Sequence, residues 1–328
     1  MTAEHPFAAF IRALGKGPNT ARPLTRAEAR AAFGMVLASQ ISPVQLGAFL
    51  CLIRVMTETP DELAGFAEAA RATLTAPEDA PDITVDWPSY AGKKRRLPWY
   101  LLSAQLLGQN GVTVFMHGHQ DPAEGRLHAG SALRALGVPA CASLSEAGRQ
   151  IALHGFAYMP LDSLSPALAE ILALRPLLGL RSPVHTVVRT LNPFNAPCQV
   201  IGVAHPPYRA LHRDAARLLG QAEVAIFKGE GGEAERRPEK PCDVATIAGE
   251  ENWPALTEHP RAFADDGMDT ARLAAVWQGR VQDPIAAETV IGTAAIVLKA
   301  TGRAVTQAEA MAQAAAMWAA RRPLAVAA

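Results

Sequence analysis

Residues 83–87 read Ile-Thr-Val-Asp-Trp, and residues 99–107 read Trp-Tyr-Leu-Leu-Ser-Ala-Gln-Leu-Leu. The first stretch has the β-rich composition of a strand, and the second is long and apolar enough for a buried helix. In a strand–turn–helix unit, backbone N–H groups at the start of the helix can hold a phosphate. The turn between these two stretches carries Lys-Lys-Arg-Arg at 93–96 and a single glycine, Gly92. A phosphate is therefore expected to meet cationic side chains here rather than a glycine-rich backbone.

Further β-branched runs follow along the chain and alternate with helical patterns. The expected strands are residues 112–115, 184–188, 200–203, 224–227 and 244–247, and helices are expected around 131–136, 145–153 and 208–219. Alternation of this kind predicts an α/β fold with an open, mostly parallel sheet and helices on both faces.

The first 80 residues predict a small all-helical subdomain. Thr25 and Glu28 form a capping box, and Ser42 is a cap residue before a proline at the first helical position. Thr59-Pro60-Asp61-Glu62 combines both signals. A helical, apolar stretch at about 160–180 is expected to return the chain to this subdomain. The α/β subdomain would then comprise residues 81–159 and 181–328, with a last helix at 304–321.

The composition is that of a globular protein with a large core. Hydrophobic residues make up 49% of the chain and charged residues 19%. No run of about 18 apolar residues suggests a membrane-spanning helix, and the N-terminus lacks the pattern of a secretory signal. The four cysteines lie far apart in sequence, which favours reduced thiols in a cytoplasmic protein.

Charge is distributed unevenly along the chain although the formal net charge is +0. Residues 83–228 hold 14 Lys and Arg against 8 Asp and Glu, whereas the rest holds 17 against 23. Seven of the nine histidines lie in the same basic stretch. The asymmetry indicates a positive surface for an anionic partner such as nucleic acid. The uneven distribution is explained equally well by chance. Positive and negative side chains would then be intermixed on the folded surface.

Several motifs occur in an order that resembles one known family. They are Leu-Thr-Arg-Ala-Glu-Ala at 24–29, Val-Phe-Met-His-Gly-His at 114–119, Arg-Pro-Leu-Leu-Gly-Leu-Arg at 175–181 and Thr-Leu-Asn-Pro at 190–193. The chain resembles the anthranilate phosphoribosyltransferase family, also called glycosyl transferase family 3, over nearly its whole length. The resemblance implies a helical subdomain, an α/β subdomain, and a homodimer formed through the N-terminal helices.

The chain departs from the family pattern where the chemistry takes place. The family binds the pyrophosphate of phosphoribosyl pyrophosphate with Gly-Thr-Gly-Gly-Asp, whereas residues 86–92 here read Asp-Trp-Pro-Ser-Tyr-Ala-Gly. Bulky side chains and proline block a close backbone approach. Met116 and His119 replace a family lysine and asparagine, and only Glu233 is left of an acidic pair that holds magnesium. Magnesium would be needed only if the protein is an enzyme. A single carboxylate supplies too few of the oxygen ligands that magnesium prefers.

These departures resemble a divergent branch of the family that binds nucleic acid with little sequence preference. We therefore expect a basic groove that binds DNA or RNA phosphates, with no required cofactor and no catalytic residue assigned. The alternative is a phosphoribosyltransferase in which Arg175 orients the acceptor and Glu233 holds the metal. The residues expected to contact nucleic acid or phosphate are Lys93, Lys94, Arg95, Arg96, His117, His119, Arg126, His128, Ser131, Arg175, Arg181, Arg189, Arg209, His212, Arg213 and Lys228.

Purely structural roles explain several of these residues as well. Residues 93–96 also fit a solvated turn. Arg175 and Arg181 also suit ion pairs with Asp162 or Glu170.

Overall fold

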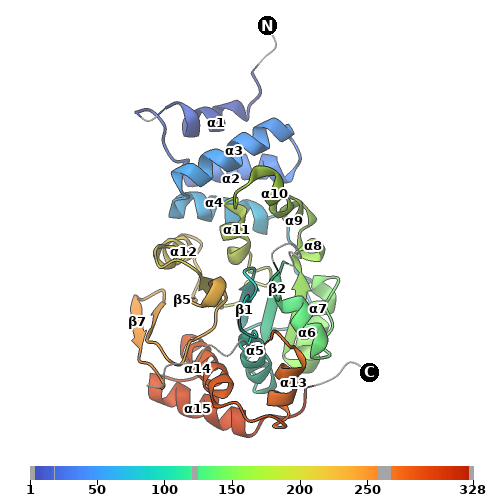
Figure 1. Ribbon diagram of the computed structural model, residues 1–328. Helices are drawn as coiled ribbons and strands as arrows, with labels where there is room; N and C mark the ends of the chain where they lie inside the picture. Colours follow the sequence, from blue (N-terminus) through green and yellow to red (C-terminus); the bar gives the residue numbers. More distant parts are fainter. Residues whose placement is uncertain (1–3, 18, 120–124, 258–266, 325–328) are drawn as a thin grey trace.

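The computed structural model describes residues 4–17, 19–119, 125–257 and 267–324. A seven-stranded sheet with the order β3-β2-β1-β4-β5-β6-β7 forms its centre (Figure 1). Neighbouring strands from β3 to β5 run parallel, and β6 and β7 are antiparallel additions at one edge. The α/β class with a mostly parallel sheet is confirmed. The strands are β1 (Val85–Ser89), β2 (Val114–Gly118), β3 (Phe156–Pro160), β4 (Cys198–Val203), β5 (Glu223–Lys228), β6 (Cys242–Ala245) and β7 (Glu250–Trp253).

Helices cover both faces of the sheet and form a separate group at one end of the molecule (Figure 1). The end group contains α1 (Ala8–Gly15), α2 (Arg26–Leu37), α3 (Pro43–Met56), α4 (Pro60–Arg71), α9 (Pro166–Ala173) and α10 (Arg175–Leu178). The others are α5 (Tyr100–Gln109), α6 (Ala129–Ala135), α7 (Leu144–His154), α8 (Leu161–Leu164), α11 (Val184–Val187), α12 (Pro207–Leu218), α13 (Ala271–Trp277), α14 (Pro284–Ala300) and α15 (Gln307–Ala319), with short 3-10 turns η2 (Val188–Thr190) and η3 (Glu230–Gly232).

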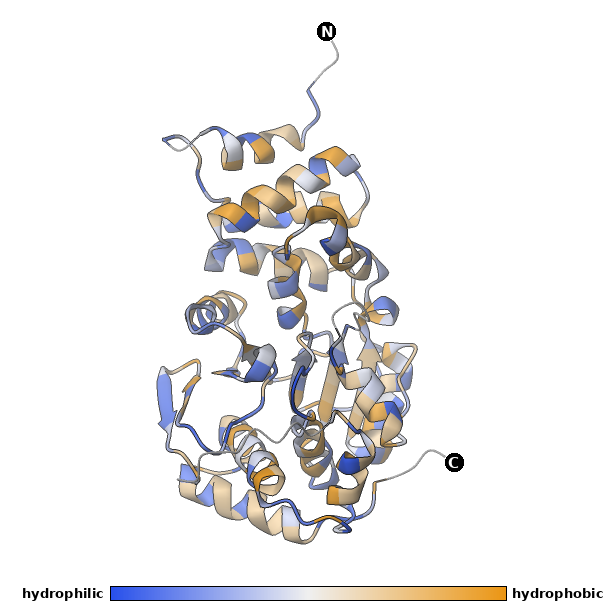
Figure 2. Cartoon of the chain, viewed as in Figure 1, coloured by the Kyte–Doolittle hydropathy of each residue, from blue (hydrophilic) through white to orange (hydrophobic). Residues whose placement is uncertain are grey.

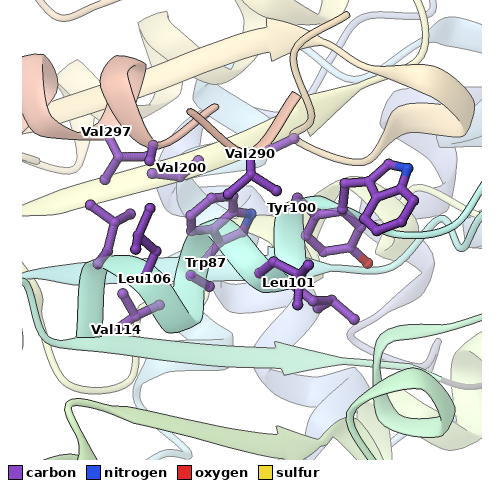
Figure 3. Close-up of a cluster of buried hydrophobic side chains, with 14 of the residues drawn as sticks. Trp87, Tyr100, Leu101, Leu106, Val114, Val200, Val290 and Val297 are labelled. Carbon is purple, nitrogen blue, oxygen red and sulfur yellow. The ribbon is translucent and has the colours of Figure 1, made fainter. Parts of the chain in front are cut away.

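One large core lies between the sheet and helices α5 and α14. Trp87 of β1 and Tyr100 of α5 stack with ring centroids 6.3 Å apart, and Val290 of α14 lies against them (Figure 3). Each of these side chains is fully buried. Burial of this apolar surface fixes α5 behind β1, so the turn that joins them is held at the end of the strand.

The helical group shares a second apolar core with one face of the sheet, where Phe115 of β2 and Met159 of β3 lie, and its helices have well-defined starts. Thr25, Ser42 and Thr59 each accept a hydrogen bond from the third helical N–H in complete capping boxes. The sequence predicts the boxes at Thr25 and Thr59, whereas at Ser42 it predicts only a cap residue before a proline. Leu168 and Ile171 of α9 share the core of α1–α4. Residues of α9 and α10 also line one groove with residues of α2 and α3.

Residues 184–188 do not form the strand that their β-branched composition predicted. They form α11 and the start of η2, because Pro183 begins a helical turn in which Thr186 N–H bonds to its carbonyl at 2.8 Å. Val184, Val187 and Val188 then fall on one buried face. This is a case in which packing overrides β-propensity.

The sheet also has two strands that the sequence did not predict, β3 and β7. The outermost, β7, is largely hydrophilic (Figure 2), which discourages pairing with other chains at an open edge. Within the described ranges, no helix is both long and apolar enough to cross a bilayer.

Candidate functional site

Loops from several parallel strands meet at the carboxyl edge of the sheet. The turn after β1 is bound to the segment before α6 by two backbone hydrogen bonds between Lys93 and Leu127, of 2.9 and 2.8 Å. From that segment, Arg126 donates to the carbonyls of Ala91 and Gly92 at 3.2 Å each. Ligands of open α/β sheets bind at this edge.

Glu233 occupies the backbone donors of the turn after β1. Its Oε1 accepts hydrogen bonds from Ala91 N–H at 2.7 Å and Gly92 N–H at 2.6 Å. The side chain is 1% exposed, and its Oε2 is buried with no hydrogen-bond partner. Gly92 has a φ of +65°, and a Cβ there would lie 2.9 Å from the His128 ring, so glycine is required. The protein's own carboxylate therefore stands where an anion would meet these two amides.

Lys93 is buried in an ion-pair network of the protein itself. Its Nζ lies 2.6 Å from Glu235 and 3.4 Å from Glu230, and its side chain is 0% exposed. Arg96 is 4% exposed and lies 3.5 Å from both Glu230 and Glu239. In the folded protein these two cations face carboxylates rather than solvent.

This burial corrects the expectation that residues 93–96 present four cations to a phosphate, and it equally excludes a wholly solvated turn. Only Lys94 and Arg95 of the run are exposed. A partial signal of this network is visible at residues 228–235, where three glutamates lie in a glycine-rich stretch.

Three predicted arginines lie in this region: Arg126 contacts the turn, and Arg181 and Arg189 line one cavity. Burial lowers the pKa of Arg189, and the charge of Arg181 lowers it further, while Glu233 opposes the shift. Burial and Arg181 lower the pKa of Arg126 in the same way. Arg181 thus lowers the pKa of both other arginines, and an anion placed beside them would relieve the repulsion. We call Arg126, Arg181 and Arg189 the arginine cluster.

Arg175 adds its charge near the same place. Burial lowers the pKa of His185 to about 3, and Arg189, Arg181 and Arg175 contribute to the shift. The histidine between these arginines is therefore neutral at pH 7, and the positive charge of the region comes from guanidinium groups.

His117 does not face a ligand as the sequence suggested. It is fully buried, its Nδ1 lies 2.6 Å from the hydroxyl of Tyr90, and its Nε2 lies 3.3 Å from Asp86 Oδ1. Asp86 in turn accepts a hydrogen bond from Gln199 at 2.9 Å. This network holds Tyr90 over the end of β2 and leaves His117 no access to phosphate.

The other predicted histidines and Ser131 differ in exposure. His128 and His212 are buried, at 3% and 1% exposed. Burial lowers the pKa of His212 to about 3, so it is neutral and gives no charge to a groove, contrary to expectation. His119, directly after β2, and Ser131, in the first turn of α6, are half-buried.

The cations on α12 contact carboxylates rather than members of the arginine cluster. Arg209 pairs with Asp243 at 3.5 Å and Glu250 at 3.6 Å. Arg213 pairs with its neighbour Asp214. Lys228 is exposed at the end of β5 and, with Arg209, lines a cavity of about 350 Å³. These residues therefore do not extend the cluster as a single row of unpaired charges.

The residues present do not fit the magnesium site that the resemblance implied. Glu233 Oε1 already accepts two amide hydrogen bonds, and Gly232 stands beside it in place of a second carboxylate. In the described part of the chain, no three side chains of His, Cys, Asp or Glu are grouped so that they could hold a metal ion.

Comparisons with known proteins agree with this architecture. The family model for the helical bundle domain of the glycosyl transferase family matches residues 8–74. An anthranilate phosphoribosyltransferase of Methylocella silvestris is 31% identical over 265 residues, which cover 78% of this chain and 72% of that protein. The chain belongs to the anthranilate phosphoribosyltransferase family.

Other members of the anthranilate phosphoribosyltransferase family and one uncharacterized relative are similar over most of the chain. The uncharacterized protein YbiB of Escherichia coli is 27% identical over 316 residues, 93% of this chain and 97% of that protein. The solved enzyme of Thermus thermophilus has a TM-score of 0.80 at 23% identity, covering 94% of both chains. The enzyme of Saccharomyces cerevisiae in complex with PRPP and Mg has a TM-score of 0.78 at 15% identity, covering 97% of this chain and 94% of its own. These two structures establish the shared fold.

Proposed function

We propose that this protein binds nucleic acid with little sequence preference, through phosphate contacts at the carboxyl edge of its sheet. The observation that carries the proposal is the placement of the arginine cluster: Arg126 contacts the turn after β1, and Arg181 and Arg189 line one cavity. Lys94 and Arg95 are exposed on the adjoining turn. Guanidinium groups bind phosphate oxygens in a bidentate manner, and the energy of such contacts is largely independent of base sequence.

The occupied amides of Ala91 and Gly92 argue against the binding of a diphosphate in the manner of the family. A diphosphate at these donors would have to displace Glu233 and bring its own charge close to that buried carboxylate. Removing a carboxylate from two short, buried hydrogen bonds is costly. An extended phosphate backbone held by side chains avoids that step.

The proposal is tested by fluorescence anisotropy with a labelled oligonucleotide at low salt. The double variant Lys94→Ala/Arg95→Ala is expected to bind about tenfold more weakly or worse, because two phosphate contacts are lost. The control, Lys16→Ala/Arg30→Ala, removes one exposed lysine and one exposed arginine from the helical group. Equal binding by both double variants, or no binding by the unaltered protein, would overturn the proposal.

A second candidate is phosphoribosyl transfer, which is favoured by the similarity to anthranilate phosphoribosyltransferases. Here Arg175 would orient the acceptor, and magnesium would arrive with the diphosphate. Incubation with phosphoribosyl pyrophosphate, magnesium and anthranilate distinguishes the two candidates. Release of pyrophosphate with enzyme-like turnover supports the transferase, and its absence alongside oligonucleotide binding supports our proposal.

A further inference from the structure

A cavity at the carboxyl edge of the sheet gathers cations from several segments. Its volume is about 350 Å³, and it lies between the end of β5, the start of α12, which packs beside β5, and the segment that leads into β6 (Figure 1). Four cations line it: Arg209, Lys228, Arg237 and Lys240. We call it the lysine cavity. It shares Ala204 with the cavity that Arg181 and Arg189 line, so the two adjoin.

Two carboxylates also line the lysine cavity, and each already faces another cation. Asp243 lies 3.5 Å from Arg209. Glu230 lies 3.4 Å from Lys93 and 3.5 Å from Arg96, which are not among the lining residues. An anion in this cavity would therefore not meet an unbalanced carboxylate.

The two arginines of the wall are held in place by carboxylates. Arg209 lies near Glu250 as well as Asp243, and Arg237 donates from its Nε to Glu239 at 2.9 Å. Their side chains are 14% and 30% exposed. Because these carboxylates balance most of their charge, the two arginines give the wall N–H groups in fixed positions rather than a net charge.

Lys228 and Lys240 supply the net charge of the lysine cavity. Both are exposed, and among the described residues neither lies within ion-pair distance of a carboxylate. Lys228 ends β5, and Lys240 is placed by a turn in which its N–H bonds to the carbonyl of Arg237 at 3.3 Å. Two unpaired ammonium groups at one cavity raise the local concentration of anions there.

The charge and size of the lysine cavity indicate which anion fits. A phosphate monoester carries a charge of about −1.5 to −2 at pH 7, which two lysines balance. Each phosphodiester inside a strand carries only about one. A volume of about 350 Å³ is near the lower end of the range for small-molecule sites, so it suits a terminal phosphate with the sugar that carries it.

Building on the proposed function, we infer that the lysine cavity binds a phosphate monoester, namely the terminal phosphate of a nucleic-acid strand. Lys228 and Lys240 contact that terminal phosphate, and the next phosphates of the strand lie along the arginine cluster. The shared wall at Ala204 makes this path continuous. A free sugar phosphate carries the same phosphate monoester, so the experiment must separate the two sources.

Fluorescence anisotropy with three oligothymidine strands of equal length, each labelled internally, tests the inference. One strand has a 5′-phosphate, one has a 3′-phosphate, and one has hydroxyls at both ends. A phosphorylated strand is expected to bind about tenfold more tightly than the hydroxyl-ended strand at low salt, because two cations contact its terminal phosphate. Lys228→Ala/Lys240→Ala is expected to lose this difference.

Two control variants show that the effect belongs to these two charges. Lys228→Arg/Lys240→Arg keeps both charges and should keep most of the difference. Lys16→Ala/Arg30→Ala removes two exposed cations from the helical group and should keep all of it. Thermal melting shows that each variant is folded. Equal binding of the three strands by the unaltered protein, or a difference that persists in Lys228→Ala/Lys240→Ala, overturns the inference.

Calorimetric titration with ribose 5-phosphate separates this inference from the proposed function. If the three strands bind equally and ribose 5-phosphate does not bind, the inference fails while nucleic-acid binding stands. If ribose 5-phosphate binds through Lys228 and Lys240 but no strand binds, the proposed function fails and the lysine cavity serves a small phosphate monoester.

Discussion

Lys93 and Lys94 are neighbours in sequence with opposite surroundings. Lys93 is fully buried against Glu235 and Glu230, whereas Lys94 is exposed. Two carboxylates near one buried ammonium balance its charge only while it is present. The two lysines therefore have different roles, one in the stability of the turn and one available to a ligand.

This contrast predicts different effects of the same substitution. Lys93→Ala is expected to lower the free energy of unfolding by about 3–5 kcal/mol, because it leaves Glu235 buried without a counter-charge. Lys94→Ala is expected to change it by about 0.5 kcal/mol or less. Urea denaturation measures both values. A similar stability for the two variants would mean that the buried ion pairs are not formed.

His212 gives a pH dependence whose sign follows from its burial. Its pKa falls from 6.5 in the unfolded chain to about 3 in the fold, so the unfolded state binds more protons below pH 6.5. Stability is therefore fully present above that pH and falls as the pH drops toward 3. At pH 5 the loss attributable to this histidine is about 2 kcal/mol.

Denaturation curves at pH 7 and pH 5 test this dependence in two variants. His212→Gln should show a smaller loss of stability between the two pH values than the unaltered protein. His5→Gln changes an exposed histidine and should show the same loss as the unaltered protein. An undiminished pH dependence in His212→Gln would contradict the account.

At the scale of elements, the end of β4 lies directly against the loop that carries Glu233. A Cβ on Gly202 would lie 2.3 Å from the backbone of both Glu233 and Ala234, so only glycine allows this approach. The close approach positions Glu233 under the amides of Ala91 and Gly92. The packing of one strand end thus determines what the neighbouring turn can bind.

Gly202→Ala is expected to cost about 1–3 kcal/mol of stability, because the backbone of the Glu233 loop must shift. Gly34→Ala in α2 meets no atom within 4 Å and is expected to be neutral or stabilising by about 0.5–1 kcal/mol. Thermal denaturation of the two variants measures the difference. If Gly202→Ala were as stable as the unaltered protein, the Glu233 loop would not pack against β4 as closely as the structure shows.

The sequence predicts an element well when the residues that determine it are close together in the chain. The capping boxes at Thr25 and Thr59 are local patterns, and both formed as expected. Residues 184–188 have strand composition, yet they form a helix because their burial against α4 and α9 is decided far away in sequence. The pairing of β3 beside β2 depends on the same kind of distant contact.

The sequence likewise predicted part of the candidate site and missed the contacts between distant residues. The sequence located the carboxyl edge and named all three members of the arginine cluster. It did not reveal that Glu233 and Glu235 fill the places where ligand charge was expected, because those contacts join residues more than 130 positions apart. It also missed Lys240, which joins Arg209 at one cavity only when β6 pairs beside β5.

At the scale of the whole molecule, the homodimer implied by the family resemblance remains a prediction. Val44 of α3 and Leu177 of α10 are 81% and 82% exposed. Beside them, parts of α2, α3, α9 and α10 line a groove of about 330 Å³ that is mostly apolar. Exposed apolar groups concentrated on one surface are typical of a protein–protein contact.

Val44→Asp is expected to shift the protein toward monomer, because it places a charge in the proposed contact. Val305→Asp introduces the same change at an equally exposed valine, 82% exposed, before α15, and should leave the mass unchanged. Light scattering after size exclusion measures both. A monomeric mass for the unaltered protein would remove the helical dimer from the account.

The central claim is that exposed and half-buried cations at the carboxyl edge bind nucleic-acid phosphates, while Glu233 keeps the family's diphosphate position closed. The most direct test is the affinity for duplex DNA measured between about 50 and 200 mM salt. Contacts from Lys94, Arg95 and the arginine cluster predict a slope of log affinity against log salt of about −4 to −5. For Lys94→Ala/Arg95→Ala the slope is expected to be shallower by about two units, because two phosphate contacts are lost. A slope near zero, or one that the double variant does not change, would contradict the account.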